Sequence, residues 1–159
     1  MLFRSELRYD TFDLQLERPL PLVQRKLRLF VKERIGADGS EVLPLDEAGV
    51  RVAAETLHAA GARSIAIAFF NSYRNPVHEL RAKEIALAAC PDLAVCTSAE
   101  IAPEVREYER FSTAVANAYV APIAMRYLIE LGKSLGVPLF IMLSDGGITT
   151  ARAASEQPI

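Results

Sequence analysis

The chain has 159 residues, enough for one domain with a hydrophobic core, and its 51% hydrophobic and 24% charged residues exclude a disordered protein. A net charge of −2 argues against nucleic acid or an anionic membrane as a partner. The sequence has no bilayer-spanning apolar run and no signal-peptide core, and its two cysteines are too few for a disulfide framework or a zinc site. We therefore expect a cytoplasmic protein without a metal site.

The two ends of the chain show little periodicity. Residues 1–26 contain proline-flanked segments and predict an irregular N-terminal segment, followed by a single α/β domain over residues 27–159. The last residues, Glu156-Gln-Pro-Ile159, contain no helix stop. We interpret both ends as cuts through a longer protein, so the domain is expected to be an internal portion of a subunit.

The first predicted elements are a hairpin, a helix and a strand. Residues 27–45 alternate apolar and charged side chains on either side of Asp38-Gly39, which predicts a β-hairpin with one solvent-facing side. Asp46 is a good N-cap for a helix over about residues 47–60. The nearly continuous apolar run over residues 64–70 is typical of a strand that is buried on both faces.

A second helix and strand follow. Asn75-Pro76 predicts a helix start with asparagine as the N-cap and proline at the first helical position, where a missing N–H donor costs nothing. This helix should end before Pro91. Residues 93–97 then predict another buried strand.

The remaining elements are a broken helix, a strand and a short helix. The helical pattern after Pro103 should break near Pro122, because an interior proline removes a hydrogen bond and clashes with the previous turn. Its second half should end at Gly136. Residues 137–143 predict a third buried strand, and a short helix should begin at about Thr150.

The alternation of strands and helices predicts the α/β fold class. Right-handed βαβ crossovers imply a mainly parallel sheet with helices on both faces. We expect the N-terminal hairpin of residues 27–45 to extend this sheet as an antiparallel edge.

Residues 98–122 mix charged side chains with a small-residue helix on a face that also carries apolar side chains. Polar groups on such a face are partly buried and need partners. The candidate site residues of this segment are Glu100, Glu109, Arg110, Thr113 and Asn117. The two glutamates and the arginine could form an acid/base set, but an Arg–Glu network that ties a helix to the sheet explains them at least as well.

A second candidate is the loop Ser144, Asp145, Gly146 and Gly147, between the third predicted strand and a helix. In open α/β sheets ligands collect at such points, and glycines let backbone N–H groups approach an anion. Asp145 could orient a hydroxyl or hold a metal-bound water. The alternative, which the residue types favour, is a tight turn that needs positive φ, with Asp145 as a local cap.

A third candidate is His78 in the first turn of the second predicted helix. It could be a general base or a ligand, but no second histidine or cysteine is close in sequence, so a packing or capping role is favoured. The sequence contains no Walker A loop, no G-x-G-x-x-G and no G-x-S-x-G motif. The residues alone therefore name no catalytic group.

Several motifs occur together and in a characteristic order. They are Val31-Lys-Glu-Arg-Ile35, Asp38-Gly39, Pro44-Leu-Asp46, Ala68-Phe-Phe-Asn-Ser-Tyr-Arg-Asn-Pro-Val-His-Glu79, Ser98-Ala-Glu100, Glu109-Arg110, Thr113, Asn117-Ala-Tyr119, Pro122 and Ile141-Met-Leu-Ser-Asp-Gly-Gly147. This set resembles the hydantoinase A/5-oxoprolinase family, which includes the related subunits of acetone and acetophenone carboxylases. Two residues depart from the family pattern: Asn71 stands where a histidine is usual, and Asp145 where an asparagine is usual.

The resemblance implies an actin-like ATPase-type architecture and ATP-dependent opening of a cyclic amide or imide, such as hydantoin or 5-oxoproline. For a full-length family member it implies ATP and Mg²⁺, held by two Asp-Gly-Gly-Thr-type loops. Neither loop occurs in this sequence, so we expect no cofactor for this chain and no activity of the chain alone. The candidate residues would then lie near the substrate, the nucleotide or an interface.

The resemblance also implies partners, which are the remainder of the same subunit, a hydantoinase B-type subunit and the cyclic amide substrate. It leaves open a non-catalytic scaffold or interface domain of a related ATP-dependent carboxylase subunit. A free-standing small-molecule-binding domain is a third alternative.

Overall fold

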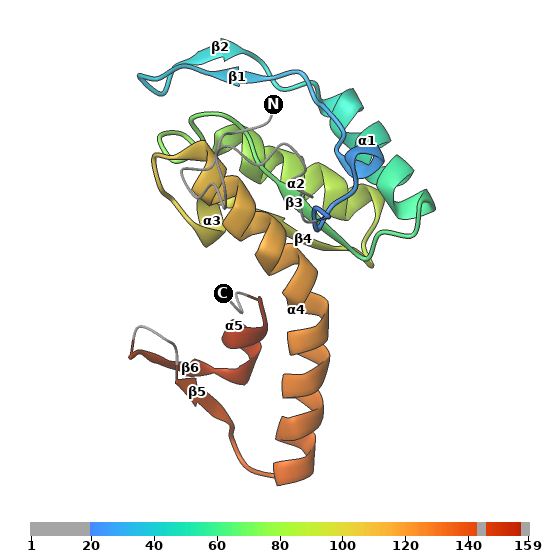
Figure 1. Cartoon of the computed structure of the whole chain (residues 1–159), viewed down its shortest axis with the longest axis vertical. Coiled ribbons are helices and arrows are strands. Elements are labelled where there is room, and N and C mark those ends of the chain that lie inside the picture. The colour runs from blue at the N-terminus through green and yellow to red at the C-terminus, as the bar shows by residue number, and fades with distance from the viewer. Residues whose placement is uncertain (1–19, 143–145, 157–159) are drawn as a thin grey trace, which may run out of the picture.

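The computed structural model describes residues 20–142 and 146–156. In chain order its elements are the 3₁₀-helix η1 (Arg25–Leu27), β1 (Arg34–Ile35), β2 (Glu41–Leu43), α1 (Glu47–Ala59), β3 (Ser64–Ile67), α2 (Val77–Ala89), β4 (Ala94–Thr97), α3 (Ser98–Ile101), α4 (Glu107–Leu135), β5 (Phe140–Met142), β6 (Ile148–Thr150) and α5 (Ala151–Glu156). The elements before α4 and the first half of α4 form one body, and the second half of α4 leads from it to β5, β6 and α5 (Figure 1).

The predicted hairpin is confirmed, because β1 and β2 pair antiparallel. Its turn is closed by a hydrogen bond from the Gly36 N–H to the Ser40 carbonyl at 2.8 Å, and Gly39 has a φ of 89°, which glycine adopts without strain. The prediction that the hairpin extends the parallel sheet is wrong, since β1 and β2 form a two-stranded sheet of their own. The side chains of Asn71 and Asn75 donate instead to the hairpin carbonyls of Ile35 and Gly39.

The helix α1 begins as predicted at an aspartate cap, where Asp46 Oδ1 accepts from the Gly49 N–H at 2.9 Å. The helix α2 begins one residue later than predicted: Pro76 is its N-cap, and Asn75 Oδ1 accepts from the Val77 N–H. The main hydrophobic core lies between these helices and the strands β3 and β4. Its buried members are Val50, Ala54, Ile65, Ile67, Ala82, Ile85, Ala86, Cys90 and Leu93.

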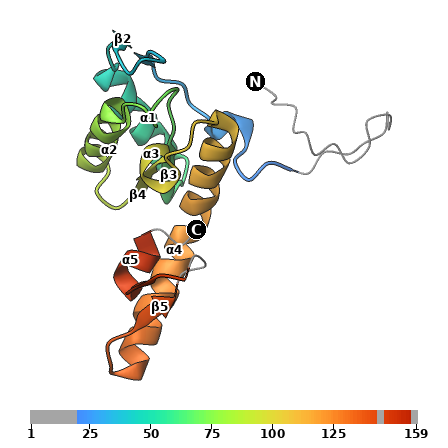
Figure 2. The same cartoon turned by 90° about the vertical axis from the view of Figure 1, so that its left-hand side faces the viewer.

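The strands β3 and β4 pair in parallel, with Ser64 opposite Ala94 and Ile67 opposite Thr97. Helices α1 and α2 lie on one side of this pair and the first half of α4 on the other, so the body has three layers (Figure 2). The α/β class is therefore confirmed. Parallel strands joined by a helix form such layers because both faces of the pair need an apolar cover.

The break predicted at Pro122 is wrong, because α4 is one helix from Glu107 to Leu135. Proline at this position removes a single intrahelical donor, and the hydrogen bonds of the turns on either side keep the helix continuous. Its end is as predicted: Gly136 adopts a left-handed φ of 64° and donates to the Gly132 carbonyl.

The predicted third buried strand does not join the parallel pair. Among the described residues β5 pairs antiparallel with β6, and its Phe140 is 62% exposed. The prediction of a mainly parallel sheet is therefore wrong, since the parallel part described consists of β3 and β4. The unbroken α4 is the reason, because a helix of 29 residues carries the chain about 43 Å along its axis before the next strand begins.

Two further points concern the whole chain. None of the helices described over residues 20–142 and 146–156 is both long and apolar enough to cross a lipid bilayer. The division into an irregular segment 1–26 and one domain over 27–159 stays a prediction.

Candidate functional site

A buried polar cluster lies where β3 and β4 end and α2, α3 and α4 meet. Its central side chains, Glu79, Ser98 and Arg110, are all 0% exposed. Glu79 comes from the first turn of α2, Ser98 begins α3, and Arg110 lies in the first turn of α4. Because charged groups are rarely so deeply buried, each must be neutralised by nearby partners.

The Glu79 carboxylate accepts three hydrogen bonds. Its Oε1 receives the Phe69 N–H at 2.7 Å and the Ser98 hydroxyl at 2.6 Å, and its Oε2 receives the Ala99 N–H at 2.8 Å. These donors compensate for the loss of water around the carboxylate.

The Arg110 guanidinium uses all three of its nitrogens. Nε donates to Ser98 Oγ at 3.1 Å, Nη1 to the Glu104 carbonyl at 2.7 Å and Nη2 to the Phe69 carbonyl at 2.9 Å. Its carbon Cζ also lies 5.5 Å from the ring centre of Tyr73 and 5.2 Å from that of Phe111. The Ser98 hydroxyl thus accepts from the arginine while donating to the glutamate, and the two charges compensate through it.

The geometry of Arg110 is that of an Arg–Glu network, but neither glutamate of the predicted pair belongs to it. Glu79 is linked to Arg110 through the Ser98 hydroxyl, and Glu107 lies 4.0 Å from Arg110 Nη2. In the sequence, Glu79 stands out only as the last residue of a family motif. The available signal was the spacing of Glu79, Ala82 and Ala86, which are all buried on one face of α2.

Glu100 and Glu109 are not brought together with Arg110. Glu100 receives Lys83 Nζ at 2.8 Å and the Thr97 hydroxyl at 2.9 Å. Burial alone raises the pKa of the Glu100 carboxyl, but the hydrogen bonds from Lys83 and Thr97 outweigh it and hold this pKa below its usual range. Glu109 is partly exposed and lies 3.6 Å from Arg106, so the three residues form no acid/base set.

Thr113 and Asn117 occupy α4 beside the strands. The Thr113 hydroxyl donates to the Glu109 carbonyl of its own helix at 2.8 Å. Asn117 is 0% exposed, and within the described part of the chain its carboxamide has no hydrogen-bond partner. It lies beside Cys96, whose thiol contacts the Ala114 carbonyl at 3.6 Å and whose pKa is raised, mainly by burial.

His78 is 4% exposed and bridges the hairpin to α2. Its Nδ1 lies 2.9 Å from Glu33 Oε2, and its Nε2 lies 3.1 Å from Glu41 Oε2. The two carboxylates face different ring nitrogens, so one metal ion cannot contact all three groups. Over the described ranges no group of three or more His, Cys, Asp and Glu side chains could hold a metal ion. These contacts hold the hairpin against α2.

The glycine loop is only partly described. Ser144 and Asp145 lie outside the described residues, whereas Gly146, with a φ of 89°, and Gly147 precede β6. The loop therefore joins two antiparallel strands. The prediction that it leads from a strand into a helix is wrong, because β6 comes before α5.

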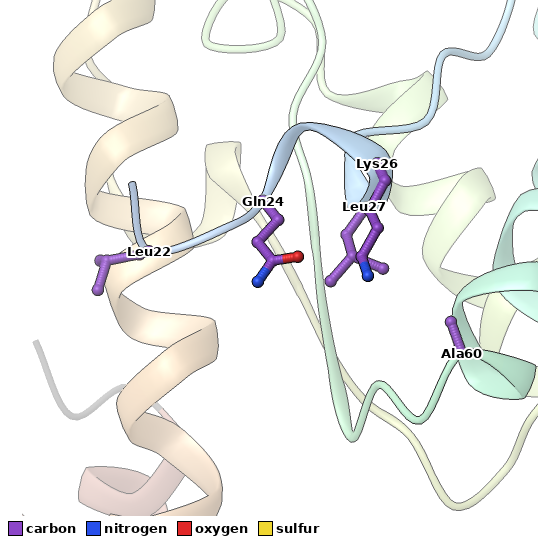
Figure 3. Close-up of a pocket in the computed structure, with 5 residues that line it drawn as sticks. All are labelled: Leu22, Gln24, Lys26, Leu27 and Ala60. Atoms are coloured by element: carbon purple, nitrogen blue, oxygen red, sulfur yellow. The ribbon is translucent and has the colours of Figure 1, made fainter. Parts of the chain in front are cut away.

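A separate cavity of about 470 Å³ lies beside η1 and the end of α1 (Figure 3). Its lining residues are Leu22, Gln24, Lys26, Leu27 and Ala60. None of the candidate residues lines it, and it offers one charged group, so its chemistry does not indicate a catalytic centre.

Two family models match the chain in sequence order. Residues 1–90 match the hydantoinase/oxoprolinase N-terminal region, and residues 110–159 match hydantoinase/oxoprolinase. The first match alone covers more than half of the chain. Glu79 falls in the first match and Arg110 in the second, so the buried cluster joins the two regions.

Known proteins of this kind are much longer than the chain. The chain is 39% identical over 143 residues to the caprolactamase subunit alpha of Pseudomonas jessenii. The matched segment covers 87% of this chain and 20% of that protein. The crystal structure of the ATP-dependent caprolactamase from Pseudomonas jessenii superposes with a TM-score of 0.84 at 35% identity, covering 97% of this chain and 24% of that one. Nucleotide-free acetone carboxylase superposes with a TM-score of 0.77 at 30% identity, covering 88% and 21%.

The chain thus spans about a fifth to a quarter of the relatives that it matches. Agreement of sequence motifs, family models and backbone confirms the resemblance inferred from the motifs. The chain belongs to the hydantoinase/oxoprolinase family.

Proposed function

We propose that the chain is a portion of an ATP-dependent hydrolase of cyclic amides or imides. The observation that supports this most is the likeness to an ATP-dependent caprolactamase over 97% of the chain. Caprolactam, hydantoin and 5-oxoproline all contain a ring C–N bond of an amide or imide. A ring of this class is the proposed substrate.

The proposed chemistry needs ATP because an amide carbonyl is a poor electrophile. When bound elsewhere in a complete subunit, ATP would supply a phosphoryl group that makes this carbonyl reactive. The described residues do not fit ATP and Mg²⁺: Arg110 is fully buried and engaged, and the described part of the chain has no metal-binding group. We therefore derive no step of the reaction from them.

The proposed contribution of the described residues is to hold the framework of the site. Glu79, Ser98 and Arg110 fix the loop after β3 against α4, and Lys83 and Glu100 join α2 to α3. Thr113, Asn117 and His78, with the loop of Gly146 and Gly147, stay candidates for positions near the substrate, the nucleotide or an interface. The remainder of the subunit and a hydantoinase B-type subunit are the proposed partners.

The test compares a complete subunit that contains these residues, expressed with its B-type partner, and the chain of 159 residues. We expect the complete assembly to release phosphate from ATP in step with ring opening of hydantoin, 5-oxoproline or caprolactam. The 159-residue chain should release none. ATP-independent ring opening, or ATP hydrolysis by the short chain, contradicts the proposal.

The loop variants sharpen this test. Asp145→Ala in the complete subunit should abolish turnover, whereas Asp145→Asn, which installs the usual family residue, should retain it. Unchanged turnover in Asp145→Ala removes this loop from the proposed site.

The alternative is a non-catalytic scaffold or interface domain of an ATP-dependent carboxylase subunit. It is supported by the TM-score of 0.77 with acetone carboxylase, which is lower than the 0.84 with the caprolactamase. Under this alternative ATP consumption depends on a ketone and bicarbonate, and Asp145→Ala leaves it largely unchanged.

A further inference from the structure

The contact between α4 and the parallel strands is made by small side chains. The buried α4 residues on this side include Ala114, Ala118 and Ala121. Alanine side chains form a smooth surface, whereas interlocking ridges and grooves need larger ones. Ridge-and-groove packing of large side chains therefore contributes little to the direction of α4 along these strands. The Phe70–Phe111 contact after β3, with ring centres 6.0 Å apart, and directional polar contacts contribute more.

Arg110 supplies the most specific of these contacts. It lies in the first turn of α4 and donates to three segments at once: the Phe69 carbonyl after β3, the Ser98 hydroxyl after β4 and the Glu104 carbonyl before α4. The aromatic rings of Tyr73 and Phe111 further confine the guanidinium.

The loop between β3 and α2 is tied to the same point. Phe69 donates its N–H to Glu79 and accepts from Arg110 through its carbonyl, so one peptide segment is held by both charged side chains. A displacement of this loop must therefore lengthen or break the contacts of Arg110. Asn71 in this loop has a φ of 57°, which is uncommon for a residue other than glycine.

The far half of α4 carries the last elements of the chain. Figures 1 and 2 show α5 and the β5–β6 pair beside that half, below the three-layer body. From Arg110 to Leu135 the helix axis extends about 38 Å, so a tilt of about 10° at Arg110 displaces the far end by about 7 Å. Small movements at the start of α4 are thus amplified.

We propose that the cluster of Glu79, Ser98 and Arg110 is a conformational anchor that couples the loop between β3 and α2 to the direction of α4. Movement of this loop would swing α5, β5 and β6 relative to the three-layer body. The proposal concerns the mechanics of the fold and does not depend on the proposed reaction.

The experiment measures the distance between two spin labels by pulsed electron paramagnetic resonance. One label is placed at Glu55→Cys on the exposed side of α1 and the other at Lys133→Cys near the end of α4, with Cys90 and Cys96 replaced by alanine. In Arg110→Gln we expect the mean distance to shift or its distribution to broaden by about 5 Å or more, from the lever geometry. A loop variant, Asn71→Val, should change the distribution in the same way.

The matched control is Arg106→Gln, which removes an arginine one turn earlier whose side chain is 78% exposed. It should leave the distribution unchanged. If circular dichroism shows that Arg110→Gln does not fold, Ser98→Ala, which removes only the shared hydroxyl, decides in its place. Distributions that match the parent in a folded Arg110→Gln or Ser98→Ala chain overturn the anchor, and a parent-like Asn71→Val overturns its coupling to the loop.

Discussion

The hydroxyl of Ser98 is the smallest group in the buried cluster, yet it connects the two charged ones. It donates to Glu79 Oε1 and accepts from Arg110 Nε. Because a hydroxyl can be donor and acceptor together, it lets opposite charges compensate without direct contact. The charge compensation in the cluster therefore depends on the carboxyl group of Glu79.

Glu79→Gln tests this dependence. The glutamine amide would present a donor to the Ser98 hydroxyl or to the Ala99 N–H, both of which donate to Glu79. It would also remove the negative charge that faces Arg110 through Ser98 and leave Glu107, 4.0 Å from Arg110 Nη2, as the nearby carboxylate. We expect the free energy of unfolding in urea to fall by about 2–4 kcal/mol. The control Glu84→Gln on the same helix, with a side chain 68% exposed, should change it by less than ~0.5 kcal/mol. Equal effects of both variants would show that Glu79 is not held as described.

The pair of Lys83 and Glu100 makes a prediction about pH. The folded pKa of Glu100 lies below its ordinary value of 4.5, so the pair stabilises the fold above that pH. This contribution disappears as the pH falls through the folded pKa, because Glu100 then binds a proton in both states. Lys83→Met should lower the free energy of unfolding by up to ~1 kcal/mol at pH 7 and by progressively less toward pH 3. A pH-independent difference would contradict the assignment.

The sequence indicates Arg110 as a site residue but not its link to Glu79, for a physical reason. The spacing of residues 98–122 indicates charged residues on a partly apolar helix face. Spacing within one segment cannot predict contacts with residues that are distant in the sequence. Glu79 is linked to Arg110 only because the end of β4 places Ser98 between them. Glu100 and Glu109 are near Arg110 in sequence, but Glu100 forms an ion pair with Lys83 and Glu109 with Arg106.

At the scale of single elements, Pro122 is the residue whose effect was predicted wrongly. The continuous helix around it means that α4 tolerates a residue which lowers helix stability. Pro122→Ala should restore the missing donor and raise the free energy of unfolding by about 1–3 kcal/mol, measured in urea. The control Pro138→Ala lies beyond the Gly136 cap and should give no such gain. A loss of stability in Pro122→Ala would indicate that the ring makes essential contacts.

The elements that could be predicted are those with local causes. Asp46 caps α1 and Gly136 ends α4 through hydrogen bonds within a few residues, and both were read correctly from the sequence. The position of the β1–β2 hairpin depends on residues far from it in the sequence. Asn71, Asn75 and His78, which all follow α1 in the chain, form hydrogen bonds with it. The turn residues of the hairpin therefore predict that it forms, but not where it packs.

At the scale of the whole molecule, the elements before Pro122 form a body with a buried core, whereas the elements beyond Pro122 bury few side chains. The main core cluster lies between residues 50 and 93. Beyond Ala121, Ala154 is the one buried hydrophobic among the side chains described there. Large apolar side chains of that part are exposed, namely Ile123, Tyr127, Ile129, Leu135, Val137, Phe140, Met142 and Ile148. The elements beyond Pro122 therefore have little burial of their own to stabilise them.

This contrast predicts a hierarchy of local unfolding. Amides of β3, β4 and α2 should open only in global unfolding, whereas those of α5, β5, β6 and the last turns of α4 should exchange at least about tenfold faster, because fewer buried contacts oppose their opening. Hydrogen exchange followed by mass spectrometry measures both groups in one sample. Truncation after residue 122 should then leave the protection of β3, β4 and α2 unchanged. Slow exchange of β5 and β6 at the rate of the core would mean that the far part unfolds only together with the body, and that α4 transmits stability along its whole length.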